Sequence, residues 1–90
     1  MENIGCKVIV SGLVQGVGFR YYTSWEAGQR GLTGHAKNLY DGNVEVILYG
    51  SREKINTMLQ WLEKGPRIAR VDALKVTDIS YVEEPDFSCC

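Results

Sequence analysis

The chain has 90 residues, a formal net charge of −1 and 44% hydrophobic residues, a composition typical of one ordinary globular domain. The near-neutral charge argues against a nucleic-acid-binding protein that relies on bulk positive charge, and against a membrane-surface peptide. No apolar run approaches the ~20 residues of a membrane span, and the N-terminus lacks the basic and apolar regions of a secretion signal. We therefore expect a single domain over residues 1–90, in the cytoplasm, without nucleic-acid or membrane partners.

The first third of the chain predicts a strand followed by a helix. Residues 6–14 alternate in polarity, as expected of a strand. A loop with two glycines follows, and residues 21–30 show helical spacing. On this helix we expect Tyr22 and Ala27 to face inward and Trp25 to be a partly exposed flank residue.

The middle of the chain predicts a hairpin and a second helix. Residues 33–38 and 44–49 form its two strands, joined by a turn rich in Asp, Gly and Asn. The second helix is expected to begin after Ser51 as its N-cap and to end at the Gly-Pro pair 65–66. Its inward face follows the i, i+3, i+4, i+7 pattern, with Ile55, Met58, Leu59 and Leu62.

The last third predicts one long strand and one short strand. Residues 71–82 form the long strand, and a slip in its alternation indicates a β-bulge. Residues 87–89 form the short strand after a Glu-Glu-Pro break. The element order is that of the split β-α-β, or ferredoxin-like, α+β sandwich, with an antiparallel sheet and both helices on one face. Right-handed crossovers place the first and third strands in the middle.

The loop at residues 13–20 has the features of an anion cradle. Gly16 and Gly18 let the backbone turn tightly, and the following helix start adds unsatisfied N–H groups and a partial positive charge. Arg20 adds a planar fork of donors suited to phosphate. The loop does not match a Walker sequence. It does not match the dinucleotide-binding sequence either, since Tyr21 stands where that sequence needs its third glycine. Taken alone, a tight turn with a solvated arginine explains these residues better.

Together with a second segment, the loop resembles the acylphosphatase family. Residues 12–20 match the family's G-x-V-Q-G-V-x-F-R stretch. Residues 34–50 match its G-aromatic-x-K/R-N-x-x-x-G-x-V-x-x-x-x-x-G stretch, except that His35 replaces the aromatic residue, which we expect to be a packing substitution. The resemblance covers essentially the whole chain. The ending Ser-Cys-Cys at 88–90 also departs from the usual aliphatic residues, and we expect it to lie away from both motifs.

This resemblance implies hydrolysis of acyl phosphates, small-molecule anhydrides of a carboxylic acid and phosphate, by a metal-independent enzyme without a cofactor. It assigns Arg20 to phosphoryl binding and Asn38 to holding the attacking water, as the catalytic pair. Inorganic phosphate or a similar anion is expected to bind as product or inhibitor, and the enzyme is expected to be a monomer. The phosphate-binding residues implied are Gln15, Gly16, Val17, Gly18, Phe19 and Arg20.

The cysteines and the histidine do not form a recognisable metal site. The cysteines are Cys6, Cys89 and Cys90, no pair has C-x-x-C spacing, and there is 1 histidine. Structural zinc sites usually carry such ligands in closely spaced pairs, so we expect no metal. Reduced thiols are the expectation for a cytosolic protein. A pairing of Cys6 with a C-terminal cysteine stays open.

Two binding functions are the alternatives to the enzyme. RNA-recognition domains share this element order, but their third strand carries several aromatic residues, whereas 44–49 has one aromatic and one acidic residue. A non-catalytic regulatory domain of the same fold could hold a small anion in the same cradle. The free-standing length favours the independent enzyme.

Overall fold

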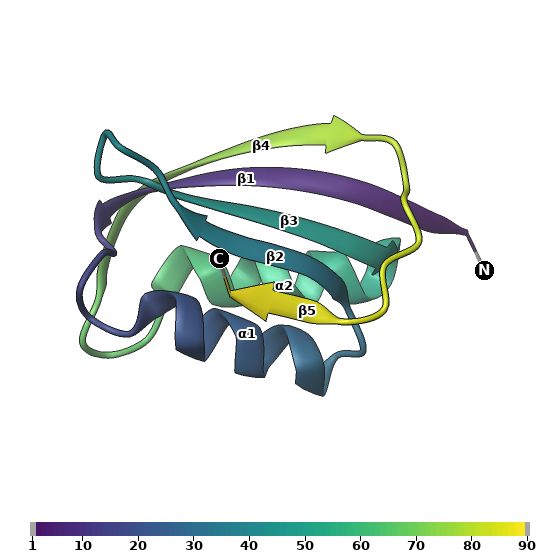
Figure 1. Cartoon of the computed structure of the whole chain (residues 1–90), viewed down its shortest axis with the longest axis horizontal. Helices are drawn as coiled ribbons and strands as arrows, with labels where there is room; N and C mark the ends of the chain where they lie inside the picture. The colour runs from purple at the N-terminus through teal and green to yellow at the C-terminus, as the bar shows by residue number, and fades with distance from the viewer. Residues whose placement is uncertain (1, 90) are drawn as a thin grey trace.

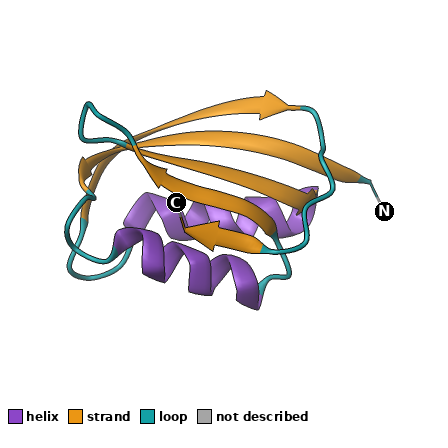
Figure 2. Ribbon diagram, in the orientation of Figure 1, coloured by secondary structure: helices purple, strands orange, loops and turns teal. Residues whose placement is uncertain are grey.

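The computed structural model describes residues 2–89 as one sheet with two helices packed on one of its faces (Figures 1 and 2). This arrangement confirms the predicted ferredoxin-like α+β fold. Neither helix in the described part of the chain is long and apolar enough to cross a membrane. In chain order the elements are β1 (Asn3–Leu13), α1 (Phe19–Gln29), β2 (Thr33–Asn38), β3 (Val44–Ser51), α2 (Arg52–Lys64), β4 (Arg70–Ile79) and β5 (Phe87–Cys89).

The strands lie in the order β4-β1-β3-β2-β5, so β1 and β3 are central, as predicted. The pairs β1–β3, β1–β4 and β2–β3 are antiparallel. The short β5 differs, because it pairs in parallel with β2, with Phe87 opposite Gly34 and Cys89 opposite Ala36. The sheet is therefore mixed rather than wholly antiparallel, and β5 runs toward the same end of the molecule as β2.

Several element bounds differ from the sequence predictions by a few residues, while those of β2 agree. β1 begins at Asn3 because its pairing with β3 continues as far as Ser51. β4 ends three residues before the predicted end, at Ile79. α1 begins at Phe19, two residues early, because Gly18 already serves as its N-cap. The last difference places Arg20 in the first helical turn rather than in the loop.

The bulge predicted in the long last strand is present in β4. Ser11 pairs with Ala73, whereas Gly12 pairs with Val71, so one residue of β4 is extra. Gly12 has φ 132, and a Cβ on it would collide with the carbonyl oxygen of Arg70. Glycine is therefore needed at position 12 for the bulge, and this first residue of the loop motif is structural.

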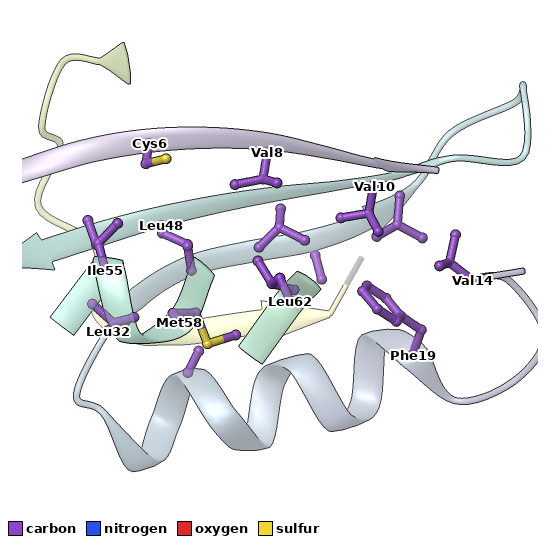
Figure 3. Packing of buried hydrophobic residues seen from close by; sticks show 14 residues of the cluster. Cys6, Val8, Val10, Val14, Phe19, Leu32, Leu48, Ile55, Met58 and Leu62 are labelled. Atoms are coloured by element: carbon purple, nitrogen blue, oxygen red, sulfur yellow. The ribbon is translucent and has the colours of Figure 1, made fainter. Parts of the chain in front are cut away.

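α2 matches its prediction at both ends and along its buried face. Ser51 caps it, since the Ser51 hydroxyl accepts a hydrogen bond from the Lys54 N–H at 3.3 Å. Gly65 ends it in a positive-φ conformation, with φ 68. Figure 3 shows the α2 side chains meeting the sheet in one apolar cluster. The fully buried residues of the predicted stripe are Ile55, Met58 and Leu62, and Leu59 is partly buried.

α1 packs through a different face from the one predicted. Ala27 is buried and Trp25 is exposed, as expected, but Tyr22 is 43% exposed and that prediction is wrong. The buried positions are Phe19, Thr23 and Ala27, which follow one another at four-residue spacing. Tyr22 belongs to the neighbouring face of the helix and lines an open hollow there.

Candidate active site

The loop between β1 and α1 leaves the N-terminus of α1 open to a ligand. The first N–H groups of a helix have no intrahelical partners, and a side chain usually caps some of them. Gly18 is the N-cap of α1 and offers no side chain, and the first turn contains no acidic residue. α2 has both features, with Ser51 as cap and Glu53 in its first turn. The N-terminus of α1 therefore has uncapped N–H groups and a partial positive charge, which suit the binding of an anion.

Two glycines shape this loop in the way the sequence predicts. Gly16 and Gly18 have φ 77 and φ 76, in the left-handed region that other residues rarely adopt. A Cβ on Gly16 would meet no atom within 4 Å, so glycine is needed there for conformation rather than for space. The open space beside Gly16 leaves the loop backbone accessible to a ligand.

A hollow of about 310 Å³ lies against this loop. Arg20, half-buried in the first turn of α1, lines the same hollow. The loop backbone and an arginine thus border one small volume, as an anion cradle requires. The lining residues are Val14, Gly16, Gly18, Phe19, Arg20, Tyr21 and Cys89.

Asn38, the predicted water-holding residue, ends β2 on the face of the sheet that the helices cover. It pairs with the buried Val44 and alternates with the buried Ala36. Its Oδ1 atom is buried, and among residues 2–89 it has no hydrogen-bond partner. An unsatisfied buried acceptor costs about 1–3 kcal/mol. Asn38 is not among the residues that line the hollow at the cradle loop.

The Gln15 side chain joins the cradle loop to the strand end that carries Asn38. Its Nε2 donates to the carbonyl oxygen of Leu39 at 2.8 Å and to that of Asn43 at 2.9 Å. Leu39 follows Asn38 directly, and its own N–H donates to the Asn43 carbonyl at 2.9 Å. The side chain of Gln15 therefore positions the two motifs relative to each other, a role that sequence reasoning missed. Only its backbone is left for the predicted phosphate contact.

Replacing Gln15 by Ala is expected to destabilise the protein by about 1–3 kcal/mol, because two hydrogen bonds to hairpin carbonyls are lost. The same change loosens the link to Asn38, so kcat/KM is expected to fall as well. Urea unfolding and steady-state hydrolysis measure the two effects. Gln60→Ala, at an exposed position of α2, is the matched control. Equal stability and activity in both variants would show that the link does not position the site.

His35 lies on the opposite face of β2 from Asn38 and takes no part in the cradle. Its Nε2 lies 3.0 Å from Oε2 of Glu45, whose Oε1 lies 3.8 Å from the Lys7 ammonium. The ring therefore joins a polar cluster across three strands, on the face without helices, rather than substituting for aromatic packing. Its position also leaves it unable to act as a base toward a ligand in the cradle.

Cys89 lies at the cradle, which corrects the expectation that the chain end is remote from both motifs. The parallel pairing of β5 beside β2 brings Cys89 to the start of α1. Its Sγ donates to the carbonyl oxygen of Arg20 at 3.3 Å and lines the same hollow. Cys6 and Cys89 are both free thiols, while Cys90 lies outside the described residues. The sequence carried no signal for this placement because the partner of β5 was not predicted.

Iodoacetamide at neutral pH is expected to alkylate Cys89 much faster than Cys6. Cys89 is exposed, whereas Cys6 is in the core. Burial, together with the nearby Asp78 carboxylate, raises the pKa of the Cys6 thiol. Only the thiolate reacts, and a raised pKa lowers the thiolate fraction at a given pH. Mass mapping of peptides after timed labelling measures both rates, and equal rates in folded protein would contradict the core position of Cys6.

Metal-ligating side chains do not gather at the cradle. Over residues 2–89, no group of three or more His, Cys, Asp and Glu residues lies close enough together to hold a metal ion. The positive charge that the described residues bring to the hollow comes from Arg20 and the helix N-terminus.

Comparisons with known proteins point to one family. The profile of the family described as Acylphosphatase matches residues 6–89. The chain is 59% identical over 90 residues to a protein named Acylphosphatase from Psychromonas ingrahamii, with 100% of both chains covered. A solved acylphosphatase from Coxiella burnetii superposes with a TM-score of 0.93 at 36% identity, covering 98% of this chain and 93% of that chain. One from Bacillus subtilis gives 0.92 at 34% identity, covering 97% and 98%.

Proposed function

The chain belongs to the acylphosphatase family and hydrolyses acyl phosphates to a carboxylate and inorganic phosphate, and we propose that it does so by direct attack of water on phosphorus. In this reaction the bond between phosphorus and the acyl oxygen breaks. The bond between phosphorus and the water oxygen forms on the opposite side, in line with the leaving group.

The leaving group explains why so few catalytic side chains are needed. A carboxylate is the conjugate base of an acid with a pKa near ~4, so it departs without a proton from a general acid. A covalent intermediate is not needed either, because water can displace so good a leaving group directly. The tasks left for the protein are to position the reactants and to stabilise charge on the phosphoryl oxygens.

Arg20 and the backbone N–H groups of residues 15–19 are proposed to hold the phosphoryl group. The open N-terminus of α1 supports this, since it leaves donors and a partial positive charge beside Gly18. The Arg20 guanidinium adds a charge and up to two parallel hydrogen bonds to the phosphoryl oxygens. These groups are fixed before the reaction, so they stabilise the transition state without reorganising.

Asn38 is proposed to hold the attacking water. An amide does not take up a proton at neutral pH, so Asn38 orients the water rather than activating it. Its buried Oδ1 can accept a hydrogen bond from the water, which leaves an oxygen lone pair directed at phosphorus. A phosphoryl oxygen of the substrate is then the acceptor for the proton that the water loses.

One observation carries this proposal: the Gln15 side chain links the cradle to the strand end where Asn38 has a buried acceptor with no hydrogen-bond partner in the described part of the chain. Anion donors and a water acceptor are thereby held on neighbouring segments. Binding alone would need the donors but not the acceptor.

Hydrolysis in ¹⁸O-labelled water, with a metal chelator present, tests the proposal. Attack at phosphorus places the label in inorganic phosphate and none in the carboxylate, and the chelator leaves the rate unchanged. Phosphorus NMR of the phosphate and mass spectrometry of the carboxylate read the two products. Label in the carboxylate would mean attack at the acyl carbon, and loss of rate with the chelator would mean that a metal takes part.

We also propose that the protein works as a monomeric single domain in the cytoplasm and that inorganic phosphate competes with the substrate. The core supports a monomeric single domain, since both helices and the central strands of one chain contribute to a single cluster. The cradle supports the second proposal, because the product carries the same phosphoryl oxygens as the substrate.

A further inference from the structure

Two buried side-chain polar atoms in the described part of the chain have no hydrogen-bond partner. They are the hydroxyl oxygen Oγ1 of Thr23 on α1 and the amide oxygen Oδ1 of Asn38 at the end of β2. Buried hydroxyl and amide groups almost always have a partner, because an unpaired polar group in the interior is costly. Asn38 already has a proposed role in the reaction. Thr23 has none, so its buried hydroxyl needs a physical explanation.

Thr23 is an unusual residue for the position that it occupies. It is the buried polar residue among the otherwise apolar buried residues of 2–89, with 0% exposed. It lies between Phe19 and Ala27 on the face of α1 that packs against the sheet. A helical threonine commonly bonds a carbonyl oxygen of the preceding turn, as Thr57 does with Lys54 at 2.8 Å, but Thr23 makes no such bond. Packing alone would be served equally well by valine, which has a similar shape without the hydroxyl.

The contacts of β5 place Thr23 over the last part of β2. Figure 1 shows β2 and β5 pointing toward the end of the molecule where α1 begins. Cys89 on β5 pairs with Ala36 on β2, and its Sγ donates to the carbonyl oxygen of Arg20 at 3.3 Å. A helical carbonyl group points along the axis toward the next turn, so this oxygen lies at the level of Thr23. Thr23 is therefore close to Ala36, which is one inward-facing position before Asn38.

The direction of the Thr23 side chain brings its hydroxyl toward Asn38. Side chains on a helix lean toward its N-terminus, which in α1 is the cradle end. Asn38 follows Ala36 by two residues toward that same end, so both side chains lie on the face of the sheet that α1 covers. A hydroxyl donor and an amide acceptor, both buried and both without a protein partner, thus face the same space between α1 and β2.

We propose that Thr23 is a positioning residue for Asn38, and that one buried water molecule joins the Thr23 hydroxyl to Asn38 Oδ1. The hydroxyl donates to this water, and the water donates to Oδ1. The bridge satisfies both buried atoms, as internal waters commonly do. An amide oxygen accepts two hydrogen bonds, so Oδ1 keeps a lone pair for the attacking water. The inference rests on the proposed role of Asn38 and adds what holds its amide in the orientation that this role requires.

Replacing Thr23 by Val tests the link, because valine keeps the shape of the side chain and removes the hydroxyl. We expect kcat for acetyl phosphate to fall about tenfold, while KM and inhibition by inorganic phosphate change less than about twofold. Thermal unfolding is expected at the same or a higher temperature, since a buried polar group is removed. Thr77→Val, at an exposed position of β4, is the matched control and is expected to behave as wild type.

Thr23→Ser separates positioning from packing, because serine keeps the hydroxyl and loses a buried methyl group. It is expected to retain the wild-type kcat although it unfolds at a lower temperature. The Val and Ser variants should therefore rank in opposite order for activity and for stability. Activity that follows stability in both variants would overturn the link and make Thr23 a packing residue.

A double-mutant cycle with Asn38→Ala shows whether Thr23 acts through Asn38. In the Asn38→Ala background, Thr23→Val is expected to lower kcat by less than about twofold, because the amide that it orients is already gone. Unchanged kcat in Thr23→Val alone, or a further loss of about tenfold on top of Asn38→Ala, would overturn the link while leaving the role of Asn38 intact. Full activity of Asn38→Ala alone would instead overturn the proposed water positioning on which the link rests.

Discussion

Replacing Arg20 by Lys is expected to lower kcat/KM for acetyl phosphate by roughly 100- to 1,000-fold while the protein stays folded. Removal of one preorganised donor from a charged transition state typically costs about 3–4 kcal/mol, and each 1.36 kcal/mol is tenfold in rate. Lysine keeps the charge but replaces a planar fork with a point charge on a flexible stem. It cannot reproduce two parallel hydrogen bonds to the phosphoryl oxygens.

Steady-state kinetics and thermal unfolding of the same preparations measure the effect of this substitution. Arg52→Lys, at the exposed start of α2, is the matched control and is expected to match wild type in both. A variant with Lys at position 20 that keeps more than about a tenth of the activity would show that charge alone suffices. Inhibition by inorganic phosphate should weaken in parallel, because product and transition state share the same donors.

The fold was predictable where the sequence pattern follows local rules. Residues 33–38 alternate cleanly and end before a turn, so the predicted bounds of β2 agree with the structure. The α2 stripe combines helical spacing, the Ser51 cap and the Gly65 stop, which all indicate the same helix. Tyr22 on α1 was misplaced because the apolar pattern of that helix is weak. A small buried residue, Thr23, takes the inward position, and an apolar pattern cannot identify it.

The site was predictable in its motifs but not in the contacts that depend on long-range pairing. Gly18 and Arg20 are close in the sequence, so their joint placement at a helix start could be inferred. The bond from Gln15 to Leu39 spans 24 residues and depends on how the loop meets the hairpin. Cys89 reaches the cradle from 69 residues away, through the parallel pairing of β5. A three-residue strand gives no pattern from which its partner could be chosen.

Replacing Asn38 by Ala is expected to lower kcat by about 100-fold while changing the affinity for inorganic phosphate by less than about threefold. The amide is proposed to position the water, and a reactant misplaced by about 1 Å can cost on the order of 100-fold in rate. Phosphate binding is proposed to rely on Arg20 and the loop amides, which this substitution leaves in place. Stability is expected to hold, since the buried Oδ1 has no hydrogen-bond partner among residues 2–89, so removing this atom breaks no hydrogen bond there.

Three measurements on Asn38→Ala distinguish water positioning from a structural role. Single-turnover rates report the chemical step, phosphate titration reports the cradle, and thermal unfolding reports the fold. Asn56→Ala, at an exposed position of α2, is the control and is expected to match wild type in all three. A slow chemical step with normal phosphate binding and normal unfolding is the signature of a lost water contact. Full activity would contradict the proposed role, and a joint loss of rate, affinity and stability would instead make Asn38 a structural residue of the hairpin.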